Sequence, residues 1–101
     1  MSKHVIETVT FKLNDGASRA DFIAAAEQMN TWVKERPGFL QRRLSRTEDG
    51  TWIEQIEWAD LASAKAAAAE VGKAPANASA MSAINGPTVQ LMHSELEVVI
   101  N

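Results

Sequence analysis

The chain has 101 residues, no cysteine, and 13 acidic against 10 basic side chains, which leaves a net charge of −3. A chain of this length encloses one hydrophobic core, so we expect a single domain over residues 1–101. The acidic balance disfavours nucleic acid as a partner, and the lack of cysteine excludes disulfides and thiolate nucleophiles.

The first residues, Met1 to His4, lead directly into a strand-like pattern. They lack the apolar segment of a signal peptide, and no stretch of the sequence is long and apolar enough to cross a bilayer. We therefore expect a cytoplasmic protein without a membrane partner.

Alternating side chains predict a β-strand from Val5 to Leu13. The face with the larger side chains carries Val5, Glu7, Val9, Phe11 and Leu13. Asn14-Asp15-Gly16 follows and predicts a turn.

A helix is predicted after Ser18, because this residue precedes an acidic first turn and is a good N-cap. Its apolar stripe consists of Phe22, Ala26, Met29 and Val33. Pro37 and Gly38 predict that the helix ends near Glu35 or Arg36.

A β-hairpin is predicted next, from Phe39 to Trp58, with its turn at Glu48-Asp49-Gly50. One face of the second strand carries Trp52, Glu54, Ile56 and Trp58. Asp60 then predicts the N-cap of a second helix.

The second helix is predicted from Leu61 to Val71, where Gly72 ends it. A shorter helical segment from Pro75 to Ile84 follows, with Met81 and Ile84 expected on its inner side. The last predicted strand runs from about Val89 to Ile100.

This order of elements, βαββαβ, predicts a ferredoxin-like α+β fold with an antiparallel sheet and the helices on one face. The other face of the sheet would be bare, and we expect it to carry Ile6, Leu40, Leu44 and Ile53. A two-fold homodimer that packs sheet on sheet would cover it, and the long last strand would reach the partner.

Four features together resemble a known family: Pro37-Gly38-Phe39 after an amphipathic helix, a hairpin that closes on Trp58, an Ala-rich helix behind Asp60, and His93 in the last strand. They are similar to the antibiotic biosynthesis monooxygenase-like family of the dimeric α+β barrel superfamily. The resemblance covers nearly the whole chain. It implies a dimeric α+β barrel and a small enzyme that uses no cofactor.

Haem-degrading members of that superfamily use an Asn in the first strand, a Trp in the second helix and a His further along. The corresponding neighbourhoods here hold Glu7 or Thr8, the run Ala66 to Ala69, and Ala78 to Ser82. None of the three matches, which argues against haem degradation.

His93 is the first catalytic candidate, because a histidine in the middle of a strand is unusual and imidazole groups in general serve as acids and bases at working pH. Glu7 is the second, since a carboxylate on the apolar face of a strand must be paired or lie in a cavity. If both side chains point the same way, Glu7 would orient the imidazole. The alternatives are a structural histidine and a solvated Glu7 at the rim of the sheet.

Glu54, Trp32 and Trp58 are the candidates for substrate binding. Glu54 shares a face with Trp58 and would extend a polar cluster under the helices, or else pair with Arg43 across an exposed strand. The tryptophans, with Trp52, would line a pocket for an aromatic ligand or fill the core.

Other chemistries find little support. Every glycine is used by a turn or a helix end, which leaves none for a phosphate loop. Two distant histidines, His4 and His93, make no metal motif. Arg42, Arg43 and Arg46 lack interleaved aromatic residues and are interpreted as a solvated or ion-paired strand face.

Two functions remain. The first is a cofactor-independent monooxygenase-like enzyme that holds a small apolar or aromatic molecule between sheet and helices. In it, His93 would remove a proton, Glu7 would hold the imidazole, and dioxygen would react with the substrate carbanion. The second is a non-catalytic dimeric domain that binds a small ligand or mediates association.

Overall fold

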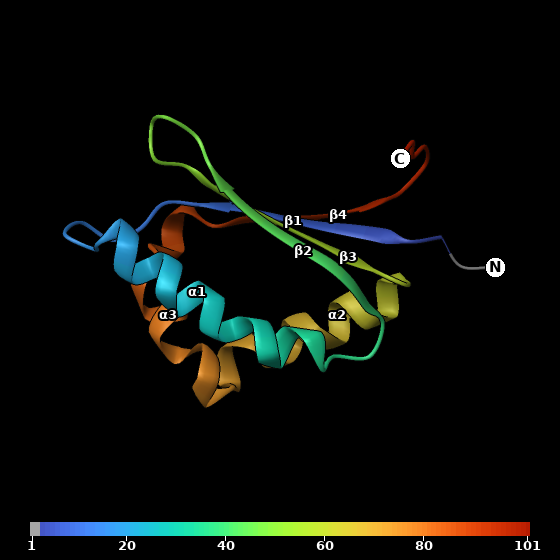
Figure 1. Cartoon of the computed structure of the whole chain (residues 1–101), viewed down its shortest axis with the longest axis horizontal. Coiled ribbons are helices and arrows are strands. Elements are labelled where there is room, and N and C mark those ends of the chain that lie inside the picture. The colour runs from blue at the N-terminus through green and yellow to red at the C-terminus, as the bar shows by residue number, and fades with distance from the viewer. Residues whose placement is uncertain (1–2) are drawn as a thin grey trace.

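A four-stranded antiparallel sheet carries three helices on one of its faces in the computed structural model, which describes residues 3–101 (Figure 1). The strands are β1 (Val5–Phe11), β2 (Phe39–Arg46), β3 (Trp52–Trp58) and β4 (Gln90–Glu95). The helices are α1 (Arg19–Lys34), α2 (Leu61–Glu70) and α3 (Ala78–Ala83). The strands lie in the order β2-β3-β1-β4, so the predicted ferredoxin-like fold is confirmed.

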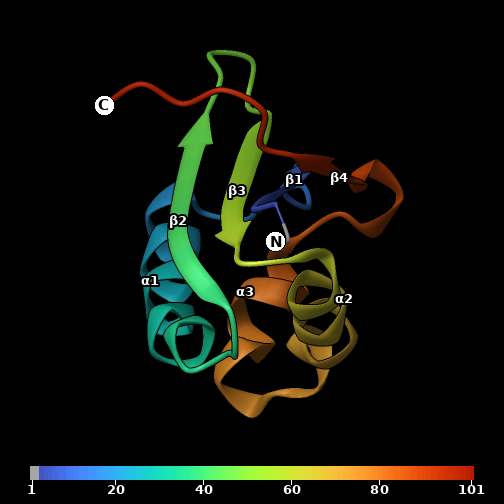
Figure 2. The same cartoon turned by 90° about the vertical axis from the view of Figure 1, so that its right-hand side faces the viewer.

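Helix α1 covers the half of the sheet that contains β2 and β3, as Figure 2 shows. The hydroxyl of Ser18 accepts a hydrogen bond from the backbone N–H of Asp21 (3.2 Å), which caps the helix as predicted. The four residues of the predicted stripe are all buried: Phe22, Ala26, Met29 and Val33. This stripe forms one wall of the core.

A β-bulge at Leu40 interrupts the pairing of β2 with β3. Phe39 lies opposite Trp58 and Gln41 opposite Glu57, so Leu40 is an extra residue without a partner. Because side chains alternate along a strand, one extra residue moves every later side chain of β2 to the other face. Arg42, Leu44 and Arg46 therefore face the helices.

The bulge corrects two predictions. Leu44 was expected on the bare face of the sheet, but it packs against the core under the helices. Of the two alternatives for Glu54, the pair with Arg43 is wrong, because Arg43 lies opposite Gln55 and points to the bare face. Arg42 takes its place beside Glu54, with a distance of 2.7 Å from Nε to Oε1.

Helix α2 begins at Leu61 because the carboxylate of Asp60 accepts the N–H of Ser63 (2.8 Å). The predicted segment from Pro75 to Ile84 is split into a 3-10 turn, Pro75–Asn77, and the short helix α3. Asn77 and Ala80 are its fully buried side chains, while the two expected on its inner side, Met81 and Ile84, line the space under the helices, Met81 with 37% of its surface exposed. Asn77 donates to the carbonyl of Val71 (2.9 Å), which joins the two halves of this connection.

Strand β4 ends at Glu95, five residues before the predicted end. The reason is the length of its neighbour: β1 begins at Val5, which lies opposite Glu95. One further hydrogen bond joins the N–H of Leu96 to the carbonyl of His4 (2.8 Å). The remaining residues leave the sheet on the side away from the helices (Figures 1 and 2) and expose Val98, Val99 and Ile100.

The opposite face of the sheet has no helix over it among residues 3–101 (Figure 1). It mixes polar residues with the half-buried Ile6 and Ile53 and the exposed Leu40 and Met92. No helix in the described part of the chain is long and apolar enough to span a membrane.

Gly38, which precedes β2, offers a test of how closely the chain packs there against the start of α2. Gly38 and Gly16 have similar positive φ angles, 83° and 84°, but a Cβ at Gly38 would lie 2.4 Å from the hydroxyl oxygen of Ser63, while one at Gly16 would meet nothing within 4 Å. We expect Gly16→Ala to lower the free energy of unfolding by about 1 kcal/mol, the cost of a left-handed residue. Gly38→Ala should lower it by at least twice as much, because the methyl group also displaces the start of α2. Urea denaturation of both variants measures this difference, and equal losses would contradict it.

Candidate functional site

An apolar cavity of about 300 Å³ lies between the inner face of the sheet and the three helices. Each of the four strands and three helices contributes at least one residue to its wall. Representative lining residues are Phe11, Met29, Val33, Ile56, Ala67 and Ala80. The alanines of α2 keep that helix slim, so the space under it stays open. Small-molecule sites span about 300–1,000 Å³, so this cavity suits a small ligand.

Three charged side chains line the cavity: Glu7, Arg42 and Glu54. Together with His93 they cross the inner face of the sheet, with one residue from each strand, and Glu54 is offset by two residues because Ile56 lies opposite both Glu7 and Arg42. Arg42 comes from β2, Glu54 from β3, Glu7 from β1 and His93 from β4. We call this set the polar row.

Glu54 and Arg42 form a bidentate ion pair at one end of the polar row. Arg42 donates from Nε to Oε1 of Glu54 (2.7 Å) and from Nη2 to Oε2 (3.1 Å). Its Nη1 also donates to the carbonyl of Ala26 and to Oδ1 of Asn30, both at 2.8 Å. The two charged side chains are only 9% and 14% exposed. Four hydrogen bonds therefore hold the guanidinium, two to Glu54 on β3 and two to α1.

Glu7 and His93 form the other pair of the polar row. They lie opposite each other on β1 and β4, and Nε2 of the imidazole is 3.1 Å from Oε1 of the carboxyl group. Glu7 is only 8% exposed. Burial raises the pKa of Glu7 above its ordinary value, the nearby charge of Glu54 adds to this, and the contact with His93 opposes it.

His93 does not line the cavity. Its imidazole contacts Glu7 from the neighbouring strand and contributes to a separate surface pocket of about 470 Å³, together with Val5, Asp60 and Leu61. Glu7 is thus the member of the pair at the cavity wall, although the sequence suggested His93 as the group nearest a substrate. The Glu7–His93 contact links the cavity to the surface.

Trp32 and Trp58 both line the cavity, whereas Trp52 does not. Trp58 is 1% exposed, and its ring meets that of Phe39 edge to face at 6.1 Å. The guanidinium of Arg36 lies 4.5 Å from the centre of the Trp32 ring. Trp58 also has a buried Nε1 that finds no hydrogen-bond acceptor among residues 3–101.

Arg42 is the member of the site that the sequence-based analysis missed. The sequence does contain a sign that Arg42 points inward. Phe39 and Leu44 are both large and apolar, but they are five positions apart, so in a regular strand they would point to opposite faces of the sheet. Both can face the core only if an extra residue intervenes between them. That same residue turns Arg42 inward. The histidine, aspartate and glutamate side chains within residues 3–101 form no group of three that could hold a metal ion.

No family model matches the chain, and no curated protein sequence matches it. Solved structures match it in shape. SnoaB, a cofactor-independent oxygenase from Streptomyces nogalater, is 17% identical over 98% of both chains, with a TM-score of 0.77. The monooxygenase of ActVA-Orf6 from Streptomyces coelicolor, in complex with nanaomycin D, is 17% identical over 98% of this chain and 92% of its own, with a TM-score of 0.65.

A dimeric ferredoxin-like protein of unknown function from Jannaschia sp. CCS1 is 15% identical over 92% of this chain and 99% of its own, with a TM-score of 0.69. The chain therefore shares its fold with monooxygenase-like proteins, as the resemblance implied. At such identities the likeness concerns the fold alone.

The ion pair in the polar row should be important for stability. Arg42→Ala leaves the carboxylate of Glu54 without its partner in a mostly buried place, and we expect a loss of about 3 kcal/mol. Arg43→Ala, on the bare face of the same strand, should change stability by less than about 0.5 kcal/mol. Chemical denaturation of the two variants measures both values, and a small effect of Arg42→Ala would show that the ion pair is solvated.

Glu7 should make folding stability depend on pH. Because its folded pKa is raised, the folded state holds the proton more tightly than the unfolded chain does. The contribution of Glu7 to stability therefore falls as pH rises from its ordinary pKa to the raised one, and stays at the lower level above that. Glu7→Gln should match the parent protein near pH 4 and exceed it by about 1 kcal/mol at pH 8. Thermal unfolding across this pH range tests the sign, and a variant that loses stability at pH 8 would contradict it.

Proposed function

We propose that this protein is a cofactor-independent monooxygenase-like enzyme whose substrate is a small apolar, aromatic molecule bound in the cavity between sheet and helices. The observation that carries the proposal is the position of Glu7. A carboxyl group with a raised pKa stands on the wall of an apolar cavity, and a histidine connects it to the surface. Buried carboxyl groups of this kind are typical of general bases.

The lining of the cavity supports an aromatic substrate. Trp32, Trp58 and Phe11 offer flat apolar surfaces, and aliphatic side chains of α1 and α2 complete the wall. Among residues 3–101, the polar lining is limited to Glu7, Arg42 and Glu54.

The proposed mechanism starts with proton removal. The carboxylate of Glu7 takes a proton from an acidic O–H or C–H of the substrate, and its raised pKa makes it a stronger base than an ordinary glutamate. His93 orients the carboxylate and receives the proton, which leaves through the surface pocket. This order differs from the one expected from the sequence, in which the imidazole acted on the substrate directly.

Dioxygen is the second reactant. The substrate carbanion transfers an electron to dioxygen, and the two recombine through a new C–O bond to give a peroxide. The peroxide accepts a proton and then loses water, so one oxygen atom stays as a carbonyl group and the other leaves as water. Two hydrogen atoms of a CH₂ group are consumed, and no external reductant is needed. Trp32 and Trp58 shape the cavity, and Glu54, held by Arg42, bounds its polar side.

The similarity to SnoaB and to the ActVA-Orf6 monooxygenase agrees with this proposal by analogy of fold. The second candidate function is ligand binding without catalysis. It is favoured by one observation: the polar row is paired within itself, Glu7 with His93 and Glu54 with Arg42. Such pairing leaves no obviously free catalytic group.

Oxygen uptake distinguishes the two functions. The protein is mixed with a panel of phenols and quinols, oxygen is followed with an electrode, and the uncatalysed rate is subtracted. We expect uptake that falls at least about 100-fold in Glu7→Gln, because the base is lost, while binding measured by tryptophan fluorescence persists. Glu57→Gln is the matched control, since Glu57 also contacts a histidine, His4, but on the other face of the sheet.

Saturable binding without oxygen uptake by the parent protein would favour the binding domain. Uptake that is equal in Glu7→Gln and Glu57→Gln would show that the base lies elsewhere. His93→Ala should reduce uptake less than Glu7→Gln and should change its pH profile. A loss of folding stability with an unchanged profile would make His93 structural.

We also infer that two copies associate through the bare face of the sheet, as the long C-terminal segment and the apolar side chains of that face suggest. The dimeric Jannaschia protein of the same fold supports this. Sedimentation equilibrium should therefore give about twice the chain mass of 11.0 kDa, and Ile53→Glu in the middle of the face should shift the protein toward monomer. A parent protein that stays monomeric at micromolar concentration would refute the dimer.

A further inference from the structure

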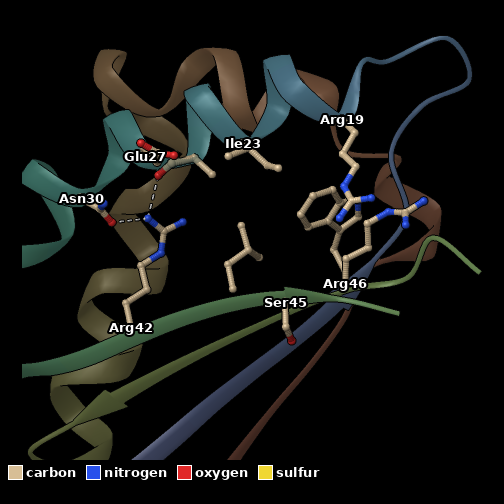
Figure 3. A pocket seen from close by; sticks show the side chains of 10 residues that line it. Arg19, Ile23, Glu27, Asn30, Arg42, Ser45 and Arg46 are labelled. Atoms are coloured by element: carbon tan, nitrogen blue, oxygen red, sulfur yellow. Dashed lines mark hydrogen bonds between the residues drawn. The ribbon is translucent and has the colours of Figure 1, made fainter. Parts of the chain in front are cut away.

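A groove of about 410 Å³ runs along the molecular surface between α1 and β2, as Figure 3 shows. Its sides carry Arg19, Ile23 and Asn30 from α1 and Arg42, Leu44 and Arg46 from β2. Of the cavity lining, only Arg42 belongs to this groove too. The α1–β2 groove is therefore distinct from the proposed substrate cavity, and Arg42 stands between them.

We propose that the α1–β2 groove binds an organic anion, a small carboxylic acid with an apolar body. The first argument is charge. The groove is lined by three arginines and one acidic residue, Glu27, in a chain whose net charge is −3. Glu54 neutralises Arg42. Arg19 and Arg46 have no carboxylate within 4 Å among residues 3–101 and are exposed.

The second argument is the placement of these two arginines. Arg19 and Arg46 lie together at one end of the groove, whereas Arg42 and Asn30 lie at the other (Figure 3). Arg19 is the first residue of α1, where the helix dipole disfavours a positive charge, so helix stability does not explain it. Arg46 faces the groove because of the bulge at Leu40, and its guanidinium carbon lies 6.0 Å from the centre of the Trp52 ring.

The third argument concerns the surface between the two ends. Ile23 is 37% exposed, Leu44 is half-buried, and the buried Trp52 forms the floor. Guanidinium groups bind carboxylates through paired hydrogen bonds. The carboxylate would therefore lie between Arg19 and Arg46, with the apolar body along Ile23 and Leu44. This apolar strip favours an organic carboxylate over inorganic phosphate.

Calorimetric titration with 2-naphthoate tests the proposal, with 2-naphthamide and inorganic phosphate as probes that lack the charge or the apolar body. We expect 2-naphthoate to bind at least tenfold more tightly than either. Replacing both arginines, Arg19→Gln with Arg46→Gln, should weaken binding at least tenfold. Arg43→Gln, on the opposite face of β2, should change it less than twofold. Raising the sodium chloride concentration from 50 to 500 mM should weaken binding several-fold, since the arginines are exposed.

The location is checked by amide chemical shifts in ¹H–¹⁵N spectra, which also show that the variants are folded. The changes should centre on residues 19–30 and 42–46. The proposal is overturned if the parent protein does not bind 2-naphthoate at millimolar concentration, if the amide binds equally well, or if the changes centre on the cavity around Glu7. Since none of these readouts involves oxygen uptake, the result is independent of the proposed enzymatic activity.

Discussion

The extra residue in β2, Leu40, determines which side of the sheet each later residue of that strand faces. Without the bulge, Arg43 and Ser45 would face the helices and Arg42 would face away. With it, Arg42 meets Glu54, Leu44 joins the core, and Arg46 lies over Trp52. The polar row and the α1–β2 groove both depend on this one change of register.

The polar row has a physical cost that an apolar core would avoid. Moving a carboxylate out of water is unfavourable unless hydrogen bonds or an opposite charge compensate, and ion pairs in such places are often no more stable than apolar side chains of similar size. Glu54 is compensated by a guanidinium with two further acceptors on α1. Glu7 is compensated less completely, as the raised pKa shows. A residue that lowers stability and lies on a cavity wall is the most informative candidate for function in this chain.

The fold alone carries little information about the reaction. An oxygenase and a protein of unknown function share this architecture with the chain at 17% and 15% identity. The function proposed therefore rests on side chains, namely the Glu7–His93 contact and the apolar lining of the cavity.

The sequence by itself determined the elements and their order. Alternation defined β1 and β3, the stripe of Phe22, Ala26, Met29 and Val33 defined α1, and local chemistry at Ser18 and Asp60 defined where helices begin. These features depend on neighbours along the chain, so a sequence pattern contains them. The pattern also placed Glu7 and the large side chains of β1 on one face, toward the helices.

Only the tertiary structure decided what depends on residues far apart in the chain. The register of β4 against β1 placed His93 opposite Glu7, and the shift at Leu40 chose Arg42 rather than Arg43 as the partner of Glu54. The end of β4 was set by where β1 begins, not by the apolar residues that follow it. A shift of one residue in strand pairing hardly changes local propensity but reverses the direction of every side chain, so such details follow from packing between strands.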